Sequence, residues 1–285
     1  MPRLTPPPDP NPRAPKLKLP AGSVDCHLHM FGPVARYPFA SDAQYISEDA
    51  TAETYFALQD RLGLAKAVLV SGGGYGESYT HLADMLAKYP QRLRGVVRLP
   101  AKFTRDALAK LDRLGVRAAR WFGGPGRIAL ERKSVEMILE FGWHIQYYPA
   151  EDGLIDVADH LLSFDTIIVL DHFAHNTTRG GMDSPGNRAL LAMLDTGRVW
   201  VKMSAPMRIA KEEPPYPSVT PIARALVKHA PERLLWGSDW PHTHLWDATM
   251  PNDGALVDLI GEWIPDAATR RRILVENPAA LYGFD

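Results

Sequence analysis

The sequence Val24-Asp-Cys-His-Leu-His-Met30 indicates the first strand of the fold, because it combines an apolar run typical of a buried strand with polar side chains at its end. Side chains alternate along a strand, so His27 and His29 are expected on one face together with Asp25. Cys26 is expected on the opposite face, which argues against a nucleophilic role. An isolated His-x-His is more often a pair of structural histidines. Its interpretation as a functional site therefore depends on which other residues the fold places beside it.

Along the whole chain, short apolar runs alternate with helical patterns. Strands are predicted at residues 24–30, 65–71, 93–99, 116–122, 144–148, 166–173, 199–204 and 234–240. Helices are predicted at residues 52–62, 79–89, 105–114, 134–141, 154–163, 188–194 and 219–229. Glycines that favour a left-handed helix end follow several of these helices, at Gly63, Gly115, Gly142 and Gly197. Eight strands with helical crossovers predict a single-domain α/β fold, a (β/α)8 TIM barrel over residues 21–285.

An open sheet that binds a dinucleotide is the structural rival. It requires Gly-x-Gly-x-x-Gly after the first strand, and this chain has no such motif there. Gly72-Gly73-Gly74 follows the second strand instead and is interpreted as an active-site loop.

Composition limits the partners. The 32 basic and 33 acidic residues give a net charge of -1, which argues against nucleic acid and against a polybasic membrane contact. The lone cysteine, Cys26, fits a reducing compartment, and with no apolar leader we expect a cytoplasmic protein. Residues 1–20 are rich in proline and are expected to form an extended arm on the barrel or on a neighbouring subunit. The expected state is a monomer or a small homo-oligomer.

Polar residues collect where the predicted strands end, which is where barrel enzymes carry their chemistry. His27 and His29 end the first strand, His172 the sixth and Asp239 the eighth. These four side chains could hold a divalent metal such as zinc and acidify a bound water. Without metal, the aspartate could take a proton from water while the imidazoles polarise a carbonyl. The residue types permit both chemistries.

Three arginines are predicted on loops at the same end of the barrel. Arg120, Arg127 and Arg208 carry the planar donor group that binds carboxylates in pairs of hydrogen bonds. Together they predict an anionic small-molecule substrate. Tyr45 and Tyr148 are further candidates for donating to a carboxylate.

Several motifs together resemble one family. They are Val24-Asp-Cys-His-Leu-His-Met-Phe-Gly-Pro33, Tyr37-Pro-Phe39, Trp143-His144, Val169-Leu-Asp-His172 and Leu235-Trp-Gly-Ser-Asp-Trp-Pro-His242. The chain is similar to the amidohydrolase-related 2-pyrone-4,6-dicarboxylate lactonases of bacterial aromatic catabolism. The resemblance implies a lactonase that needs no metal, with Asp239 as the base that activates water. It implies that His27, His29 and His172 polarise the lactone carbonyl. It further implies substrate contacts from Arg120, Arg127, Arg208, Tyr45, Ser71 and Tyr148.

Some loops depart from the family pattern. The loops at residues 71–76 and 121–127 differ, and residues 203–208 lack a cysteine and an aspartate expected before the arginine. Because these loops would touch substrate, the lactone stays open among pyrone-dicarboxylate, muconolactone and sugar-acid types. A galactarolactone-type isomerase and a metal-dependent amidohydrolase or decarboxylase remain alternatives. Asp239 favours hydrolysis, because isomerases of this family can lack that aspartate. A barrel that only binds an anion would have no use for it.

Overall fold

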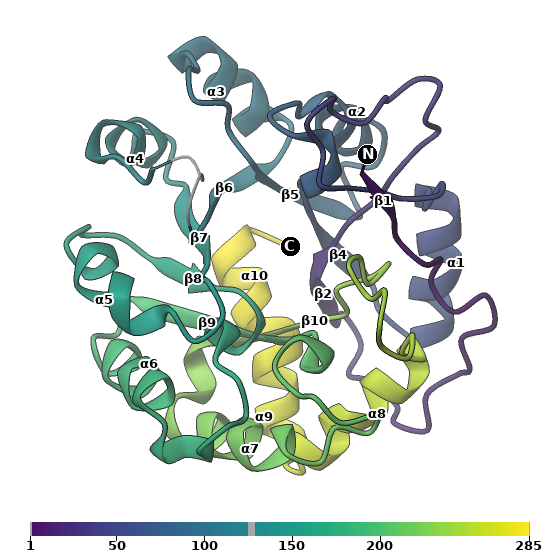
Figure 1. The fold of residues 1–285 in the computed structure, drawn as a ribbon, viewed down its shortest axis with the longest axis vertical. Coiled ribbons are helices and arrows are strands. Elements are labelled where there is room, and N and C mark those ends of the chain that lie inside the picture. Colours follow the sequence, from purple (N-terminus) through teal and green to yellow (C-terminus); the bar gives the residue numbers. More distant parts are fainter. Residues whose placement is uncertain (1, 125–128, 285) are drawn as a thin grey trace.

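The computed structural model describes residues 2–124 and 129–284. Eight parallel strands follow one another around a barrel in chain order (Figure 1). They are β2 (Val24–Leu28), β4 (Lys66–Val70), β5 (Leu93–Val97), β6 (Val116–Phe122), β7 (His144–Tyr148), β8 (Ile168–Leu170), β9 (Val199–Ser204) and β10 (Leu234–Gly237). The backbone N–H of Asp239 donates to the carbonyl of His27 over 2.8 Å, so the chain beyond β10 meets β2 and closes the ring. The predicted barrel is confirmed.

Helices surround the strands on the outside of the ring (Figure 1). They are α1 (Ala52–Leu62), α2 (Thr80–Lys88), α3 (Arg105–Arg113), α4 (Arg132–Leu139), α5 (Leu154–Leu162), α6 (Pro185–Asp195) and α7 (Val219–His229). Each matches a predicted helix within three residues at either end. Local signals set these ends: Thr51 caps α1 by accepting from the N–H of Thr54, and Gly63 ends it at a φ of 78°.

The helices of the C-terminal segment were not predicted from the sequence. It contains α8 (Asp253–Trp263), α9 (Ala267–Arg271), a π-helical turn (Arg272–Glu276) and α10 (Asn277–Tyr282). Tyr282 and Phe284 pack with the apolar side chains of the barrel interior. Tyr282 also lies 5.4 Å, ring to ring, from His144, the first residue of β7. The chain end therefore closes the barrel where its strands begin, and the opposite end is left for a site.

A β-bulge in β2 changes the direction of the first polar side chains. Asp25 pairs with Ala67 and Leu28 with Leu69, so β2 has one residue more than β4 over this span. Cys26 consequently packs in the barrel interior on the same side as His27, and Asp25 turns outward to accept from the hydroxyl of Tyr55 on α1. The prediction that Asp25 shares a face with the histidines is therefore wrong, as is the opposite placement of Cys26. Burial raises the pKa of the Cys26 thiol above its usual range.

The N-terminal arm lies on the chain's own barrel. Its strand β1 (Arg3–Leu4) pairs with β3 (Tyr45–Ile46), which precedes α1. Farther along the arm, the backbone N–H groups of Lys16 and Leu17 donate to Asp258 of α8 over 2.7 and 2.9 Å. No helix of the described residues is long and apolar enough to cross a lipid bilayer.

Candidate active site

Four buried side chains meet at the carboxyl ends of the strands. His27 and His29 come from β2 and the residue just after it, His172 begins a 3-10 turn after β8, and Asp239 follows β10. The Nε2 atoms of His27 and His29 each lie 3.8 Å from Oδ1 of Asp239, and that of His172 lies 3.6 Å away. Asp239 and His172 adopt left-handed φ values of 64° and 51°, which is uncommon outside glycine and typical of functional sites.

The two oxygens of Asp239 have different surroundings. Oδ2 accepts two hydrogen bonds from Arg208, from Nε over 2.9 Å and from Nη2 over 2.7 Å. Oδ1 of Asp239 is buried, as is Nε2 of His27, and neither atom has a hydrogen-bond partner among residues 2–124 and 129–284. Such unpaired atoms carry a desolvation cost, and a distance of 3.8 Å lets one oxygen atom beside them sit about 2.8 Å from both. They therefore mark the place for a water or substrate oxygen.

The far nitrogens of two imidazoles are anchored. Nδ1 of His29 lies 2.9 Å from the carbonyl of Val70, which can only accept, so Nδ1 carries the proton. Burial lowers the pKa of His29 to about 4, so the ring is neutral at pH 7 and its Nε2 has a free electron pair. Nδ1 of His172 lies 2.8 Å from the hydroxyl of Ser204.

A charged network, of which only Arg120 was among the predicted site residues, lies beneath these imidazoles. Lys202 of β9 is fully buried, with Nζ 2.7 Å from Oε1 of Gln146 and 3.6 Å from Oδ1 of Asp171. Arg120 donates from Nε to the other oxygen of Asp171 over 2.8 Å. Burial lowers the pKa of Lys202 to about 8, although Asp171 opposes this. Burial would raise the pKa of Asp171, but Arg120 and Lys202 outweigh it and hold that pKa below its usual value. A lysine within the apolar strand Val-Trp-Val-Lys-Met-Ser was the available signal.

A cleft of about 690 Å³ lies at this end of the barrel. Its walls include Asp42, Ala43, Gln44, Tyr45, Gly73, Gly76, Glu77, Arg98, Phe122, Tyr148, Arg208 and His244. Of the predicted substrate contacts, Tyr45, Tyr148 and Arg208 thus line it. The hydroxyl of Tyr148 lies 3.3 Å from Nε2 of His175, and the ring of Tyr45 lies 4.3 Å from that of His244. Arg98 and His244 are wall residues that were not among the predicted contacts.

Two further predicted contacts, Ser71 and Arg120, lie outside the described wall of this cleft. The hydroxyl of Ser71 accepts the backbone N–H of Arg98 over 3.0 Å. Arg120 is buried deeper, bound to Asp171, with its guanidinium 5.5 Å from the ring of Tyr148. Arg127 lies outside the described residues.

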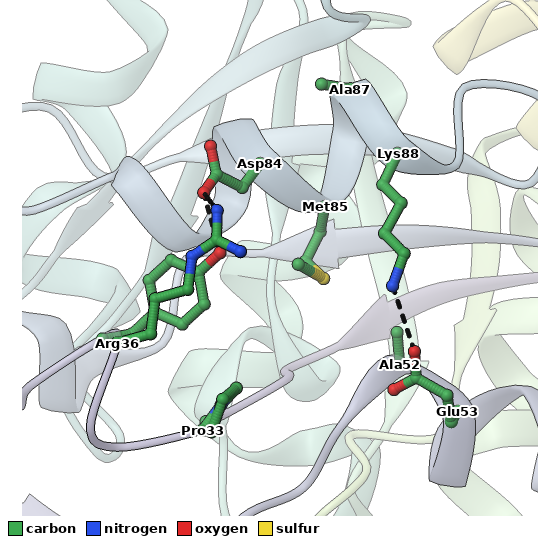
Figure 2. A pocket seen from close by; sticks show the side chains of 10 residues that line it. Pro33, Arg36, Ala52, Glu53, Asp84, Met85, Ala87 and Lys88 are labelled. Carbon is green, nitrogen blue, oxygen red and sulfur yellow. Dashed lines mark hydrogen bonds and ion pairs between the residues drawn. The ribbon is translucent and has the colours of Figure 1, made fainter.

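A second hollow, of about 460 Å³, lies between the loop after β2 and helix α2 (Figure 2). Its charged side chains pair with each other: Arg36 with Asp84 over 2.7 Å, and Lys88 with Glu53 over 3.2 Å. All four are more than a third exposed, so they are well hydrated, and the described lining contains no histidine. The chemistry therefore belongs to the first cleft.

The cluster can be tested for a metal ion of the kind that related hydrolases hold. Ligand atoms of His27, His172 and Asp239 lie within 4.8 Å of one another, which is close enough. The charges argue against it, however. Among the described residues, the cations Lys202, Arg120 and Arg208 pair with only the carboxylates Asp171 and Asp239. This site already carries an excess of positive charge, so it fits a divalent cation poorly and an anion well.

Several known proteins are similar to this chain in sequence or in structure. The chain is 36% identical over 272 residues to the 4-sulfomuconolactone hydrolase of Rhizobium radiobacter, covering 93% of this chain and 91% of that protein. It is 29% identical over 276 residues to the D-galactarolactone isomerase of Agrobacterium fabrum, covering 94% of each. A solved structure from Pseudomonas putida, assigned as a 2-pyrone-4,6-dicarboxylic acid hydrolase, is similar with a TM-score of 0.82 and 30% identity, covering 94% of this chain and 99% of that one.

These similarities confirm the resemblance to lactonases that the motifs predicted. Residues 24–284 match the amidohydrolase family, which is nearly the whole chain. The chain belongs to the amidohydrolase family.

Proposed function

We propose that this protein hydrolyses a lactone that bears one or more carboxylates, using Asp239 as the base and no metal. One observation carries the proposal: among the residues that the structure describes, Oδ1 of Asp239 is buried without a hydrogen-bond partner and faces three imidazole nitrogens at 3.6 to 3.8 Å. An oxygen atom of water or substrate bound here would contact both the carboxylate of Asp239, which can accept a proton, and the imidazole nitrogens. The named activities of the relatives support a lactone as the substrate.

The reaction can be written with all atoms balanced. Oδ1 of Asp239 takes a proton from water as the water oxygen bonds to the lactone carbonyl carbon. The carbonyl oxygen becomes an oxyanion, which imidazole N–H groups stabilise. The bond from this carbon to the ring oxygen then breaks, and Asp239 returns its proton to the ring oxygen. One lactone and one water thus yield one ring-opened hydroxy acid.

The excess of positive charge supports an anionic substrate. Arg208 lines the cleft, and Tyr45 and Tyr148 present hydroxyl groups along the same walls. Guanidinium and phenol groups suit carboxylates, so these residues are the proposed substrate contacts, together with Arg120 and Arg127. Because the loops at residues 71–76 and 121–127 depart from the family pattern, the candidate substrates span pyrone-dicarboxylate, muconolactone and sugar-acid lactones.

A panel of carboxylated lactones in ¹⁸O-labelled water tests the proposal. We expect ring opening with one labelled oxygen in the new carboxylate, and unchanged rates after dialysis against a chelator. Isomerisation, favoured as the second candidate by the similarity to a galactarolactone isomerase, would move the lactone ring without incorporating label. Loss of activity on chelation, restored by zinc, would refute the metal-free mechanism.

A further inference from the structure

Lys202 is a buried charge that the proposed reaction does not use directly. Its side chain is completely shielded from solvent and lies directly beneath His27. Keeping a lysine ammonium in a barrel interior is costly unless its donors are all satisfied. The contacts of Nζ therefore indicate the role of Lys202.

Two hydrogen-bond acceptors and one carboxylate oxygen surround Nζ of Lys202. They are Oε1 of Gln146 at 2.7 Å, Oδ1 of Asp171 at 3.6 Å and Nδ1 of His27 at 3.4 Å. The amide of Gln146 is oriented by its partners, because its Nε2 donates to Asp171 over 3.1 Å and so leaves its oxygen facing the ammonium. An ammonium has donors and no acceptor, so Nδ1 of His27 must accept.

A carboxylate competes for the same ring nitrogen. Oδ1 of Asp171 lies 3.2 Å from Nδ1 of His27, close enough to receive a proton from it. Within the described residues, however, that oxygen has no partner in hydrogen-bonding geometry, whereas Lys202 does bond to Nδ1. The proton of neutral His27 is thus displaced to Nε2, which points at Asp239.

We propose that Lys202 is a positioning residue that holds His27 as the Nε2–H tautomer, so that this imidazole donates to the substrate carbonyl oxygen. The chemical meaning of this inference rests on the proposed lactone hydrolysis. His29 is held in the opposite tautomer by the carbonyl of Val70 and offers a free pair at Nε2. The two histidines of one motif then have different tasks: His27 binds the oxyanion, and His29 accepts a hydrogen bond from the attacking water. This differs from the role that the family resemblance implied for His29.

The same contact disfavours metal binding. A metal-ligating histidine needs a free pair on the coordinating nitrogen and usually donates its other N–H to a carboxylate or carbonyl. Asp171 is the carboxylate that could accept such an N–H from Nδ1 of His27, but Lys202 prevents Nδ1 from carrying the proton. Removing Lys202 should therefore convert Nε2 of His27 from a hydrogen-bond donor into a nitrogen that can bind a metal ion.

The test measures the tautomer and zinc affinity. Nitrogen-15 NMR of histidine-labelled protein, with His27 assigned by its loss in His27→Gln, should show protonated Nε2 in the wild type. In Lys202→Met, the proton should move to Nδ1, and affinity for Zn²⁺ alone, measured by equilibrium dialysis, should rise about tenfold or more. The kcat for lactone should fall about a hundredfold while KM changes little, as expected when an oxyanion donor is lost.

His144→Leu serves as the matched control, since it also removes a buried polar group from the barrel but at the end far from the cleft. It should leave the His27 tautomer, zinc affinity and kcat unchanged. Protonated Nδ1 on His27 in the wild type would overturn the inference, as would an unchanged tautomer in Lys202→Met. The wild-type spectrum decides the matter even if Lys202→Met does not fold. It also separates the two proposals, because it does not depend on any lactone being hydrolysed.

Discussion

Arg208 donates two hydrogen bonds to one oxygen of Asp239, Oδ2, over 2.9 and 2.7 Å, and leaves Oδ1 to the imidazoles. The carboxylate is thereby fixed with one oxygen directed at the reacting centre. The opposite charge of Asp239 outweighs burial and raises the pKa of Arg208, so the guanidinium stays charged. An arginine predicted to hold substrate therefore also orients the proposed base.

Replacing Arg208 with lysine should uncouple these contacts. A lysine keeps the charge but loses the planar pair of donors, so Asp239 gains freedom to rotate. Losing charged hydrogen bonds worth about 1.5–3 kcal/mol should lower kcat/KM for a carboxylated lactone roughly ten- to a hundredfold, with kcat itself reduced. Steady-state kinetics measure this. A change in KM alone would mean that Arg208 only binds substrate.

Asp239→Asn should remove the proposed base while keeping its shape. The amide cannot take a proton from water, so we expect kcat to fall by about two to four orders of magnitude. Circular dichroism and the thermal midpoint should confirm that the variant is folded. Near wild-type turnover in a folded variant would refute the mechanism.

Gly237→Ala should disturb His27 through packing. A Cβ at this position would lie 2.7 Å from the backbone nitrogen and Cβ of His27. We expect destabilisation by about 1–3 kcal/mol, measured by urea unfolding, and a displaced imidazole that costs up to about a hundredfold in kcat. Gly261→Ala is the control, because its Cβ would meet only Leu17 at an ordinary 3.6 Å. Equal effects of the two substitutions would contradict the crowding argument.

His144 should make stability depend on pH. Burial lowers its pKa from 6.5 to about 3, so below pH 6.5 the unfolded chain binds a proton that the folded chain does not. Its contribution to stability is present above pH 6.5 and is lost as the pH falls towards 3. Between about pH 5.5 and 4 the loss approaches 1.4 kcal/mol per pH unit. His144→Leu should lack this slope.

The measurement is the difference between the two urea-unfolding series across this pH range. Asp25 acts in the opposite direction, because burial raises its pKa from 3.8 to about 6, and its contribution to stability is lost as the pH rises through 6. Since Asp25 is present in both proteins, its effect cancels in the difference. Parallel pH curves for wild type and His144→Leu would contradict the prediction.

Deleting residues 2–8 should weaken substrate binding. The arm supplies β1 as the partner of β3, and the N–H of Thr5 donates to the carbonyl of Ile46 over 2.9 Å. Because Tyr45 of β3 lines the cleft, its loosening should raise KM roughly three- to tenfold, the equivalent of one or two lost hydrogen bonds, with kcat little changed. An unchanged KM would show that β3 holds its position without the arm.

The sequence predicted most of what depends on neighbours along the chain. The apolar runs and the glycines after the helices are local signals, and they located the eight strands and seven of the helices. The convergence of His27, His172 and Asp239 could also be anticipated, because parallel strands in a barrel end on one rim. The C-terminal helices were missed, since they follow the last crossover and do not continue the strand–helix alternation.

The inward or outward direction of the side chains, and their contacts, could be read only from the folded barrel. The bulge in β2 depends on its register with β4, and a shift of one residue reverses every side chain beyond it, so Asp25 and Cys26 were misplaced. Lys202 of β9, Gln146 of β7 and Asp171 just after β8 are far apart in the sequence, and the two buried charges are tolerated only because these side chains meet. The alternation of side-chain direction along a strand follows from the local backbone. The pairing register of a strand and the partners of a buried charge, in contrast, are set by segments far away in the sequence.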